Sequence, residues 1–445
     1  MPRPAPRRFP PLPAPVPAAG ATPAPAEVPR SVVVVGAGLA GAQTVGALRE
    51  HGFDGTITVL GAEGVPPYDR PPLSKELISR PGPVWLSEDI GVDITTLADD
   101  VRLADPAGRL RAVPGGVVVE TASGAEVTAD AVVLATGSTP LLPPGWEAAW
   151  TLNTTVDAAR LRAALQPVPS GPGLRLVIVG AGWIGAELAG VAAHEGADVT
   201  VVEAAATPLD RQLGATVGAH LTPWYAAAGV RLLTGTAVTG VDAGGVTLDT
   251  GRRLPADVVI AAVGARPATG WLTGAVPLDA TGRVPVDGVG RLTDRVWAVG
   301  DVAVRSHPVF GPVPGGHWSA ALHDPQPTVR AMLGLAPVAP HAPYVFSRQL
   351  GHDLALVGLP TPDDRVLLRG DPAAGGPWAA FYVAPTGARD GRAALVRAVL
   401  LADSPREVGA LRRLMGGPEP LYVDPARAQD PAVRLRDTAL APASR

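Results

Sequence analysis

Residues 31–61 read SVVVVGAGLAGAQTVGALREHGFDGTITVLG, and this stretch decides the fold class. A β-branched run precedes a glycine cluster, a helical pattern and a second β-branched run. Gly36, Gly38 and Gly41 have the spacing G-x-G-x-x-G. The first glycine permits a tight turn, the second lets a pyrophosphate approach the backbone, and the third lets the helix pack against the strand. Because the helix also presents free N–H groups to the phosphates, the stretch predicts a dinucleotide-binding βαβ unit.

A second unit of the same design follows in residues 174–206, which read LRLVIVGAGWIGAELAGVAAHEGADVTVVEAAA. Its glycines are Gly180, Gly182 and Gly185, and its second β-branched run ends in Glu203. A carboxylate at this place can accept hydrogen bonds from both ribose hydroxyls of NAD and would repel a 2′-phosphate. The sequence therefore favours NADH over NADPH.

Two copies of the motif carry more weight than one, because a single glycine-rich turn between a strand and a helix is common. Together they predict an α/β fold with two Rossmann-like, three-layer dinucleotide-binding domains. In the first unit the strand-end acid is missing at Ala62, and Glu63 either binds the ribose or is a solvated loop carboxylate. From about residue 337 the pattern alternates as in strands and then turns helical at residues 405–416, which predicts a third domain of the α+β type.

The composition excludes several classes of protein. A net charge of −4 with a pI of about 6.1 gives no reason to expect nucleic-acid or membrane binding. The absence of cysteine removes disulfides, thiolate nucleophiles, Cys-ligated zinc and a self-made iron–sulfur cluster, and we expect no metal site. Residues 1–30 contain 11 prolines and no apolar signal segment, which predicts a disordered tail and a cytoplasmic protein.

Three further motifs carry a resemblance to a known family. They read VVLATGSTP (132–140), VVIAAVGARP (258–267) and RVWAVGDVA (295–303). With the two glycine units they resemble the FAD/NAD flavoprotein reductases, in which the first unit binds FAD and the inserted second unit binds the nicotinamide nucleotide. After the proline-rich tail at 1–30, the resemblance implies an FAD-binding domain at 31–146 and 265–335, an NAD-binding domain at 147–264 and a C-terminal α+β domain at 336–445.

Two more motifs narrow the resemblance. PPYDRPPLSKEL (66–77) and the pair His317–Trp318 look like the ferredoxin reductases of Rieske-type oxygenase and bacterial monooxygenase systems, the type of putidaredoxin reductase. This implies an FAD-dependent NAD(P)H:ferredoxin reductase of the EC 1.18.1 type, which passes a hydride from NADH to FAD and single electrons to a [2Fe–2S] ferredoxin or a rubredoxin. The disulfide reductases and NADH oxidases of this fold use a redox cysteine, which this chain lacks.

The resemblance and the motifs together give a set of expected cofactor-binding residues. Those expected at FAD are Gly36, Gly38, Ala40, Gly41, Glu63, Arg70, Lys75, Val101, Ala135, Thr136, Gly137, Asp301, His317 and Trp318. Those expected at NAD are Gly180, Gly182, Ile184, Gly185, Glu203 and Gly264. Several have a structural alternative: Arg70 could cap the proline-rich loop, Trp318 could pack the core, and His317 is expected to be structural rather than a proton donor.

Lys75 is the only lysine of the chain, and the other 36 of its 37 basic residues are arginine. On the family pattern it lies beside the flavin, and Glu187 lies on the NAD side of the same ring. We expect these two catalytic residues to meet at the junction of the cofactors, orient the nicotinamide and tune the flavin potential, since a compact ammonium suits a crowded place better than a guanidinium. The alternatives are a surface lysine and an acid on a helix surface.

Several positions depart from the family pattern. Ala62 and Thr139 bear on FAD affinity, whereas Gly316, Arg348 and the helix at 323–334 bear on the acceptor-facing side. Arginines of the third domain could face an acidic ferredoxin or form a solvated surface. They are Arg365, Arg369, Arg389, Arg392, Arg397, Arg412 and Arg413. Arg266 is a candidate for the hinge between the FAD and NAD domains.

Two other functions stay open at this point. One is an NADH-dependent flavoprotein that reduces rubredoxin, a quinone or oxygen, and the other is a non-enzymatic NADH sensor like the apoptosis-inducing factors of this fold. We expect a monomer or a weak homodimer.

Overall fold

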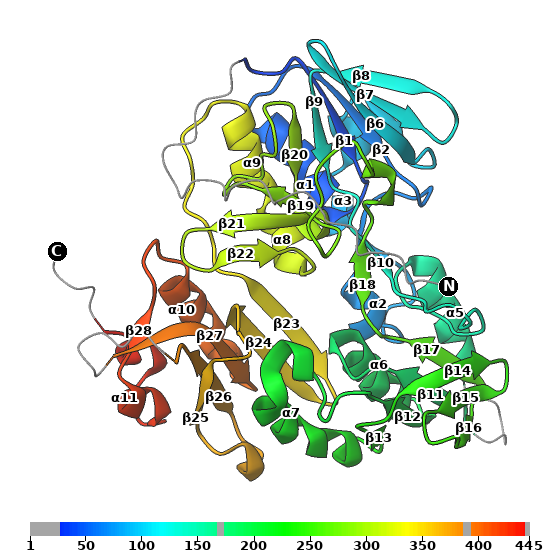
Figure 1. Cartoon of the computed structure of the whole chain (residues 1–445), viewed down its shortest axis with the longest axis vertical. Helices are drawn as coiled ribbons and strands as arrows, with labels where there is room; N and C mark the ends of the chain where they lie inside the picture. Colours follow the sequence, from blue (N-terminus) through cyan, green and yellow to red (C-terminus); the bar gives the residue numbers. More distant parts are fainter. Residues whose placement is uncertain (1–26, 167–172, 386–392, 441–445) are drawn as a thin grey trace, which may run out of the picture.

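The computed structural model describes residues 27–166, 173–385 and 393–440, and its three parts are visible in Figure 1. The predicted tail at 1–30 lies mostly outside these residues. The first part is built on a parallel five-stranded sheet in the order β20-β9-β1-β2-β5. In that order the strands span Val296–Ala298, Ala131–Leu134, Ser31–Val35, Thr56–Leu60 and Asp100–Arg102.

The β-branched run of β1 is buried on both faces, which explains why it is apolar throughout. Val32 and Val34 join the core under helices α1 (Leu39–Glu50) and α9 (Pro325–Met332). Val33 and Val35 join the core on the other face, under the antiparallel strands β6, β7 and β8. These strands span Ala107–Val113, Gly116–Thr121 and Glu126–Ala129. The predicted three-layer arrangement is therefore confirmed for this part.

The second part repeats the plan with the parallel order β13-β12-β11-β17. These strands span Arg231–Leu233, Asp198–Val202, Arg175–Val179 and Val258–Ala261. One face packs on helices α6 (Trp183–His194) and α7 (Asp210–Ala227), and the other on an antiparallel sheet. That sheet consists of β14 (Val238–Asp242), β15 (Gly245–Leu248) and β16 (Arg253–Pro255).

Two short strands connect the first and second parts. β10 (Ser138–Pro140) leaves the first part and pairs antiparallel with β18 (Ala265–Pro267), which returns to it. Arg266 is exposed on this ladder opposite Thr139, in the connection where a hinge is expected. Helix α5 (Thr155–Ala164) is the first helix of the second part, and Trp150 before it already bridges to Ile260 of β17.

The remaining elements of the first part lie after β2 and after β18. They are β3 (Tyr68–Asp69), α2 (Pro72–Lys75), β4 (Val84–Trp85), α3 (Leu86–Asp89), α4 (Ile94–Leu97), β19 (Val284–Val286), β21 (Ala303–His307), β22 (Gly311–Pro314) and α8 (Trp318–His323).

The third part is an antiparallel sheet in the order β23-β24-β27-β26-β25, with β28 beside β27. The strands span Tyr344–Gln349, His352–Gly358, Ala394–Ala402, Trp378–Val383, Arg365–Arg369 and Tyr422–Val423. Helices α10 (Pro405–Met415) and α11 (Pro425–Gln429) cover one face, so the predicted α+β domain is confirmed.

The other face of this sheet packs on the second part. The Trp224 ring of α7 stacks on His352 with the ring centroids 3.9 Å apart, and the Tyr382 hydroxyl donates to the carbonyl of Leu213 at 2.9 Å. One apolar core therefore runs through both parts. Across the described ranges, none of the helices has the length and apolarity needed to cross a bilayer.

Candidate functional site

The first glycine loop has room for a ligand and little room for side chains. Gly36 has φ +118°, and a Cβ on it would lie 2.2 Å from the carbonyl oxygen of Ala135. A Cβ on Gly41 would lie 1.8 Å from the carbonyl oxygen of Gly36, so helix α1 can approach the strand only without a side chain there. A Cβ on Gly38 would meet nothing within 4 Å. This open space at the start of α1 is where a pyrophosphate would lie.

The second glycine loop has the same geometry. A Cβ on Gly180 would lie 2.4 Å from the carbonyl oxygen of Ala262, and one on Gly185 would lie 2.1 Å from that of Gly180. Gly182 again borders open space, with the Gln212 amide nitrogen at 4.0 Å as its nearest neighbour. Both loops therefore fit a dinucleotide phosphate.

The other expected FAD residues near the first loop converge at the carboxyl ends of β1, β9 and β20. Ala135 lies against Gly36, and the Thr136 hydroxyl donates to the carbonyl of Ala268 at 2.9 Å. Asp301 accepts a hydrogen bond from the Ser138 hydroxyl at 2.7 Å, which ties the segment after β20 to the segment after β9. Ligands of open α/β sheets bind at this end of the strands.

Three more expected FAD residues have structural surroundings. Ala40 is buried, and its Cβ lies near Gly300, while Val101 is half-buried on the edge strand β5. Gly137 has φ +70°, which suits a turn after the strand.

Glu63 and Arg70 contact each other. The Arg70 guanidinium forms an ion pair with Glu63 and donates to the carbonyl of Asn153, and it lies over the Tyr68 ring. The Tyr68 hydroxyl donates to Glu63 at 2.6 Å. Burial raises the pKa of Tyr68 to about 12, against the opposing charge of Arg70, so the hydroxyl remains a donor at neutral pH. Arg70 thus links the proline-rich loop to the segment before α5.

Lys75 and Glu187 meet, as the sequence analysis expects. The Lys75 Nζ atom lies 2.8 Å from Glu187 Oε1, and the side chains are 17% and 3% exposed. The Ser74 hydroxyl donates to Glu187 Oε2 at 2.6 Å, and the Ser347 hydroxyl donates to Oε1 at 2.5 Å. Lys75 Nζ also lies 5.0 Å from the centroid of the Phe346 ring, within range of a cation–π interaction.

These contacts join all three parts of the chain. Lys75 and Ser74 belong to α2 of the first part, Glu187 to α6 of the second, and Phe346 with Ser347 to β23 of the third. Ser74, Phe346 and Ser347 have no site role among the sequence-based predictions, although Ser74 precedes Lys75 in the same motif and Ser347 precedes Arg348, one of the departures from the family pattern.

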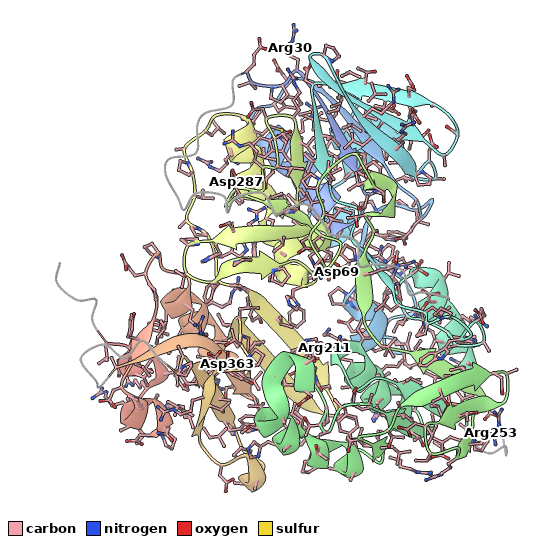
Figure 2. The ribbon with its side chains drawn as sticks, viewed as in Figure 1. Arg30, Asp69, Arg211, Arg253, Asp287 and Asp363 are labelled. Carbon is pink, nitrogen blue, oxygen red and sulfur yellow. The ribbon has the colours of Figure 1, made fainter. Side chains whose placement is uncertain are left out.

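The indole group of Trp318 contacts two other side chains of the protein, Asp69 and Phe346. The Nε1–H donates to Asp69 Oδ1 at 2.7 Å, and the ring meets Phe346 edge-on with the centroids 5.7 Å apart. Burial raises the pKa of Asp69, and the indole N–H opposes that rise. Asp69 lies near the centre of the view in Figure 2, and the sequence analysis does not identify it, although it belongs to the motif at 66–77.

His317 precedes α8 and is held neutral. Burial lowers the pKa of His317, with the charge of Asp301 opposing the change and that of Arg283 adding to it.

Glu203 links its strand end to the second glycine loop. One carboxylate oxygen accepts from the Ala181 N–H at 2.7 Å and the other from the Ala205 N–H at 2.8 Å. Ile184 is 48% exposed beside the loop, which gives the site an apolar surface. Gly264 is exposed, and its carbonyl accepts from the Leu141 N–H at 2.9 Å. Arg211 is exposed in the first turn of α7 (Figure 2).

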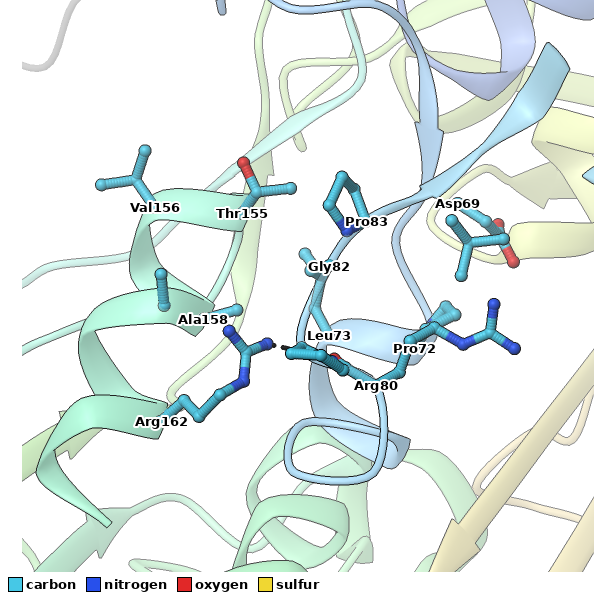
Figure 3. Close-up of a pocket in the computed structure, with 13 residues that line it drawn as sticks. Asp69, Pro72, Leu73, Arg80, Gly82, Pro83, Thr155, Val156, Ala158 and Arg162 are labelled. Atoms are coloured by element: carbon cyan, nitrogen blue, oxygen red, sulfur yellow. Dashed lines mark hydrogen bonds between the residues drawn. The ribbon is translucent and has the colours of Figure 1, made fainter. Parts of the chain in front are cut away.

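A groove of about 370 Å³ borders α2 (Figure 3). Pro72 and Leu73 line one side, and Thr155, Val156 and Arg162 of α5 line the other. The Arg162 Nε–H donates to the carbonyl of Leu77 at 2.7 Å and so fastens the loop after α2 to α5.

The arginines of the third part are not all on a docking surface. Arg365, Arg397, Arg412 and Arg413 are exposed. The expectation for Arg369 is wrong, because its side chain is buried and donates to the carbonyls of a turn after α11. Arg389 and Arg392 lie outside the described residues.

Comparison with known proteins decides the family. Residues 30–324 match the pyridine nucleotide-disulphide oxidoreductase family, and residues 344–439 match the reductase C-terminal family. The chain belongs to the pyridine nucleotide-disulphide oxidoreductases. Since it has no cysteine, it cannot hold the redox disulfide that this family name mentions.

Known proteins are similar to this chain over nearly its whole length. The probable ferredoxin reductase CtmF of Castellaniella defragrans is 33% identical over 86% of this chain and 93% of its own length. The ferredoxin–NAD(+) reductase component of the anthranilate 1,2-dioxygenase system of Burkholderia cepacia is 32% identical over 91% and 98%. A chain in the crystal structure of the covalent putidaredoxin reductase–putidaredoxin complex has a TM-score of 0.82 and 27% identity, over 92% and 98%.

Family membership and the two glycine loops together support FAD and a nicotinamide nucleotide as the cofactors of this oxidoreductase. The convergence of Gly38, Ala135 and Asp301 fits FAD. The loop at Gly182, with Glu203 at its strand end, fits the nicotinamide nucleotide.

Proposed function

We propose that this oxidoreductase is an FAD-dependent NADH:ferredoxin reductase that supplies electrons to a Rieske oxygenase or a cytochrome monooxygenase. The observation that carries the proposal is the Lys75–Glu187 ion pair, which joins the two dinucleotide-binding parts at one buried point. The names of the relatives and of the structural neighbour support the same activity.

The residues have distinct roles in the proposed function. Bound FAD would accept a hydride and release its two electrons one at a time. Gly38 and the start of α1 would bind its pyrophosphate, and Asp301 would bind its ribityl chain. Gly182 and the start of α6 would bind the pyrophosphate of the nicotinamide nucleotide. Lys75 and Glu187 would orient the nicotinamide, because each is fixed by neighbours on both sides of the junction.

The preference for NADH is part of the proposal. The Glu203 carboxylate is fixed by two backbone N–H groups at the strand end, where a nucleotide ribose would lie. Two ribose hydroxyls can donate to it, whereas a 2′-phosphate would bring like charges together. Arg211 is exposed in the first turn of α7 and is the first cation after Glu203 in the sequence.

The proposed acceptor is a [2Fe–2S] ferredoxin, with a rubredoxin as the alternative acceptor. Exposed arginines of the third part would attract its acidic surface. They are Arg348, Arg365, Arg397, Arg412 and Arg413. The proposal includes a cytoplasmic protein that draws on the cell's NADH and is a monomer or a weak homodimer.

Purified protein tests the function. It should be yellow, be bleached by NADH without oxygen, and reduce cytochrome c rapidly only when a ferredoxin is added. Reduction of a quinone or oxygen at the same rate without ferredoxin would replace the proposal by the first alternative. Bleaching by NADH with negligible turnover under all acceptors would replace it by the sensor.

A further inference from the structure

The surroundings of Glu187 contain one contribution from the third part that the proposed function does not use. Glu187 is 3% exposed, and each of its oxygens is within hydrogen-bond distance of a donor. Two of the donors, Lys75 and Ser74, come from α2. The third is the hydroxyl of Ser347, which reaches the carboxylate from a strand 160 residues away in sequence.

The orientation of the Ser347 hydroxyl is determined by its neighbours. The Gln349 amide N–H donates to Ser347 Oγ at 3.1 Å, which occupies an acceptor position of that oxygen. The hydroxyl proton is therefore left to point to Glu187 Oε1 at 2.5 Å. Gln349 is itself buried, so the arrangement is held away from solvent.

The Ser347 hydroxyl helps to fix the orientation of the Glu187 carboxylate. Lys75 and Ser347 contact Oε1, while Ser74 contacts Oε2, so donors from two different elements hold the group. Loss of one donor leaves part of the hydrogen-bonding capacity of a buried carboxylate unmatched. Without the Ser347 hydroxyl the carboxylate is therefore free to rotate away from the Lys75 ammonium.

The strand that carries Ser347 is seated firmly on the second part. The backbone of Leu350, at φ 53°, lies so close to α6 that a Cβ on Gly190 would be 2.8 Å from Leu350 N. The same strand places Phe346 beside Lys75. β23 therefore contacts both members of the ion pair.

We propose that β23 completes the hydride-transfer site, with Ser347 as a positioning residue that holds the Glu187 carboxylate against the Lys75 ammonium. This inference rests on the proposed function of the pair. It extends the site to the C-terminal domain, whose outward-facing Arg348 is the next residue of the strand and is 74% exposed.

The test compares Ser347→Ala with Ser347→Thr and with Ser319→Ala. The Ser319 hydroxyl also binds β23, since it donates to the carbonyl of Tyr344 at 2.6 Å, but it does not contact Glu187. Ser319→Ala therefore controls for a general loosening of the strand. Two properties of each FAD-loaded protein are measured between pH 5 and pH 9: the rate of flavin bleaching by excess NADH in one turnover, and the midpoint potential from titration with dithionite.

For Ser347→Ala we expect the rate of flavin bleaching to fall about tenfold across the pH range, because the Glu187–Lys75 pair is no longer held in one orientation. The midpoint potential should shift as well, because the position of the Lys75 charge beside the proposed flavin site changes. Ser347→Thr keeps a hydroxyl, so its bleaching rate and its midpoint potential should match those of the wild type. Ser319→Ala should leave both quantities unchanged.

Superimposable curves for Ser347→Ala and the wild type would overturn the inference, as would an equal change in Ser319→Ala. Should Ser347→Ala fail to fold, Ser347→Cys, whose thiol is a weaker donor, is measured in its place and should shift the curves in the same direction by a smaller amount. A wild type that NADH does not bleach contradicts the proposed function instead, and the dithionite titration still tests the role of Ser347.

Discussion

The Lys75 ammonium lies 2.8 Å from the Glu187 carboxylate, although the two residues belong to different dinucleotide-binding parts of the chain. The ion pair therefore lies where the first and second parts of the chain meet. Because the pair is nearly buried, replacing either member leaves a charge without its strongest partner.

Replacing Lys75 by Met should slow flavin reduction by NADH at least tenfold and lower the free energy of unfolding by about 3 kcal/mol, because Glu187 keeps only its two hydroxyl donors. Lys75→Arg should retain more stability but not the full rate, since a planar guanidinium is larger than the ammonium that lies between Glu187 and Phe346 and would hold the carboxylate in a different geometry. Stopped-flow bleaching and urea unfolding measure the two effects. Unchanged FAD content and unchanged rates in both variants would refute a catalytic role for Lys75.

Replacing Trp318 by Phe should destabilise the protein in a pH-dependent way. Burial raises the pKa of Asp69, and loss of the indole donor raises that pKa further. The folded-state pKa then lies above the unfolded value, so the variant binds protons more tightly when folded and loses stability as the pH rises through that pKa. We expect a loss of about 1–3 kcal/mol at pH 7.5 and a smaller loss at pH 4.5.

Urea unfolding at the two pH values measures this difference. In the Asp69→Asn background the effect of Trp318→Phe should no longer depend on pH, because the titrating group is gone. An equal loss at both pH values in the Asp69 protein would show that the indole N–H does not act on the carboxyl.

Replacing Glu203 by Gln should raise the ratio of kcat/KM for NADPH to that for NADH by about tenfold, since one negative charge near the 2′ position is removed. Asp198→Asn is the matched control, because Asp198 begins the same strand β12 and is exposed at its other end. Steady-state kinetics with both nucleotides gives the ratio. A ratio that rises equally in the control would mean that overall charge, not Glu203, sets the preference.

Replacing two different arginines of the C-terminal domain should change two different properties, the binding of ferredoxin and the stability of the fold. Arg348→Ala removes an exposed charge, so it should raise the KM for ferredoxin several-fold and weaken its dependence on salt, with little change in stability. Arg369→Ala removes a buried guanidinium that donates to several carbonyls, so it should lower the unfolding free energy by about 3 kcal/mol or more. Melting curves and ferredoxin titrations at two salt concentrations separate the two cases.

The sequence analysis predicted features that are local in the chain or that belong to a recognisable motif. The glycine loops and the three-layer parts follow from spacing and β-branched runs within about 30 residues. The meeting of Lys75 with Glu187 followed from the family resemblance. No role was predicted for Ser347 or Asp69, because their contacts with Glu187 and Trp318 span 160 and 249 residues and depend on how whole domains pack.

Arg369 was misjudged for a different reason. Its charge alone indicates an exposed side chain, and nothing nearby in the sequence marks the turn after α11 whose carbonyls accept its hydrogen bonds. Burial of a cation becomes visible only when its acceptors are brought together by the fold.

The scarcity of lysine gives this molecule a built-in reporter. An amine-acylating reagent finds only the α-amino group and the Lys75 side chain, and the latter is 17% exposed and engaged with Glu187. A second acyl group detected by mass spectrometry would therefore mark molecules in which the domain junction has opened. Footprinting of this single side-chain amine can follow the opening of the domain junction with time, as nucleotides and protein partners bind and dissociate.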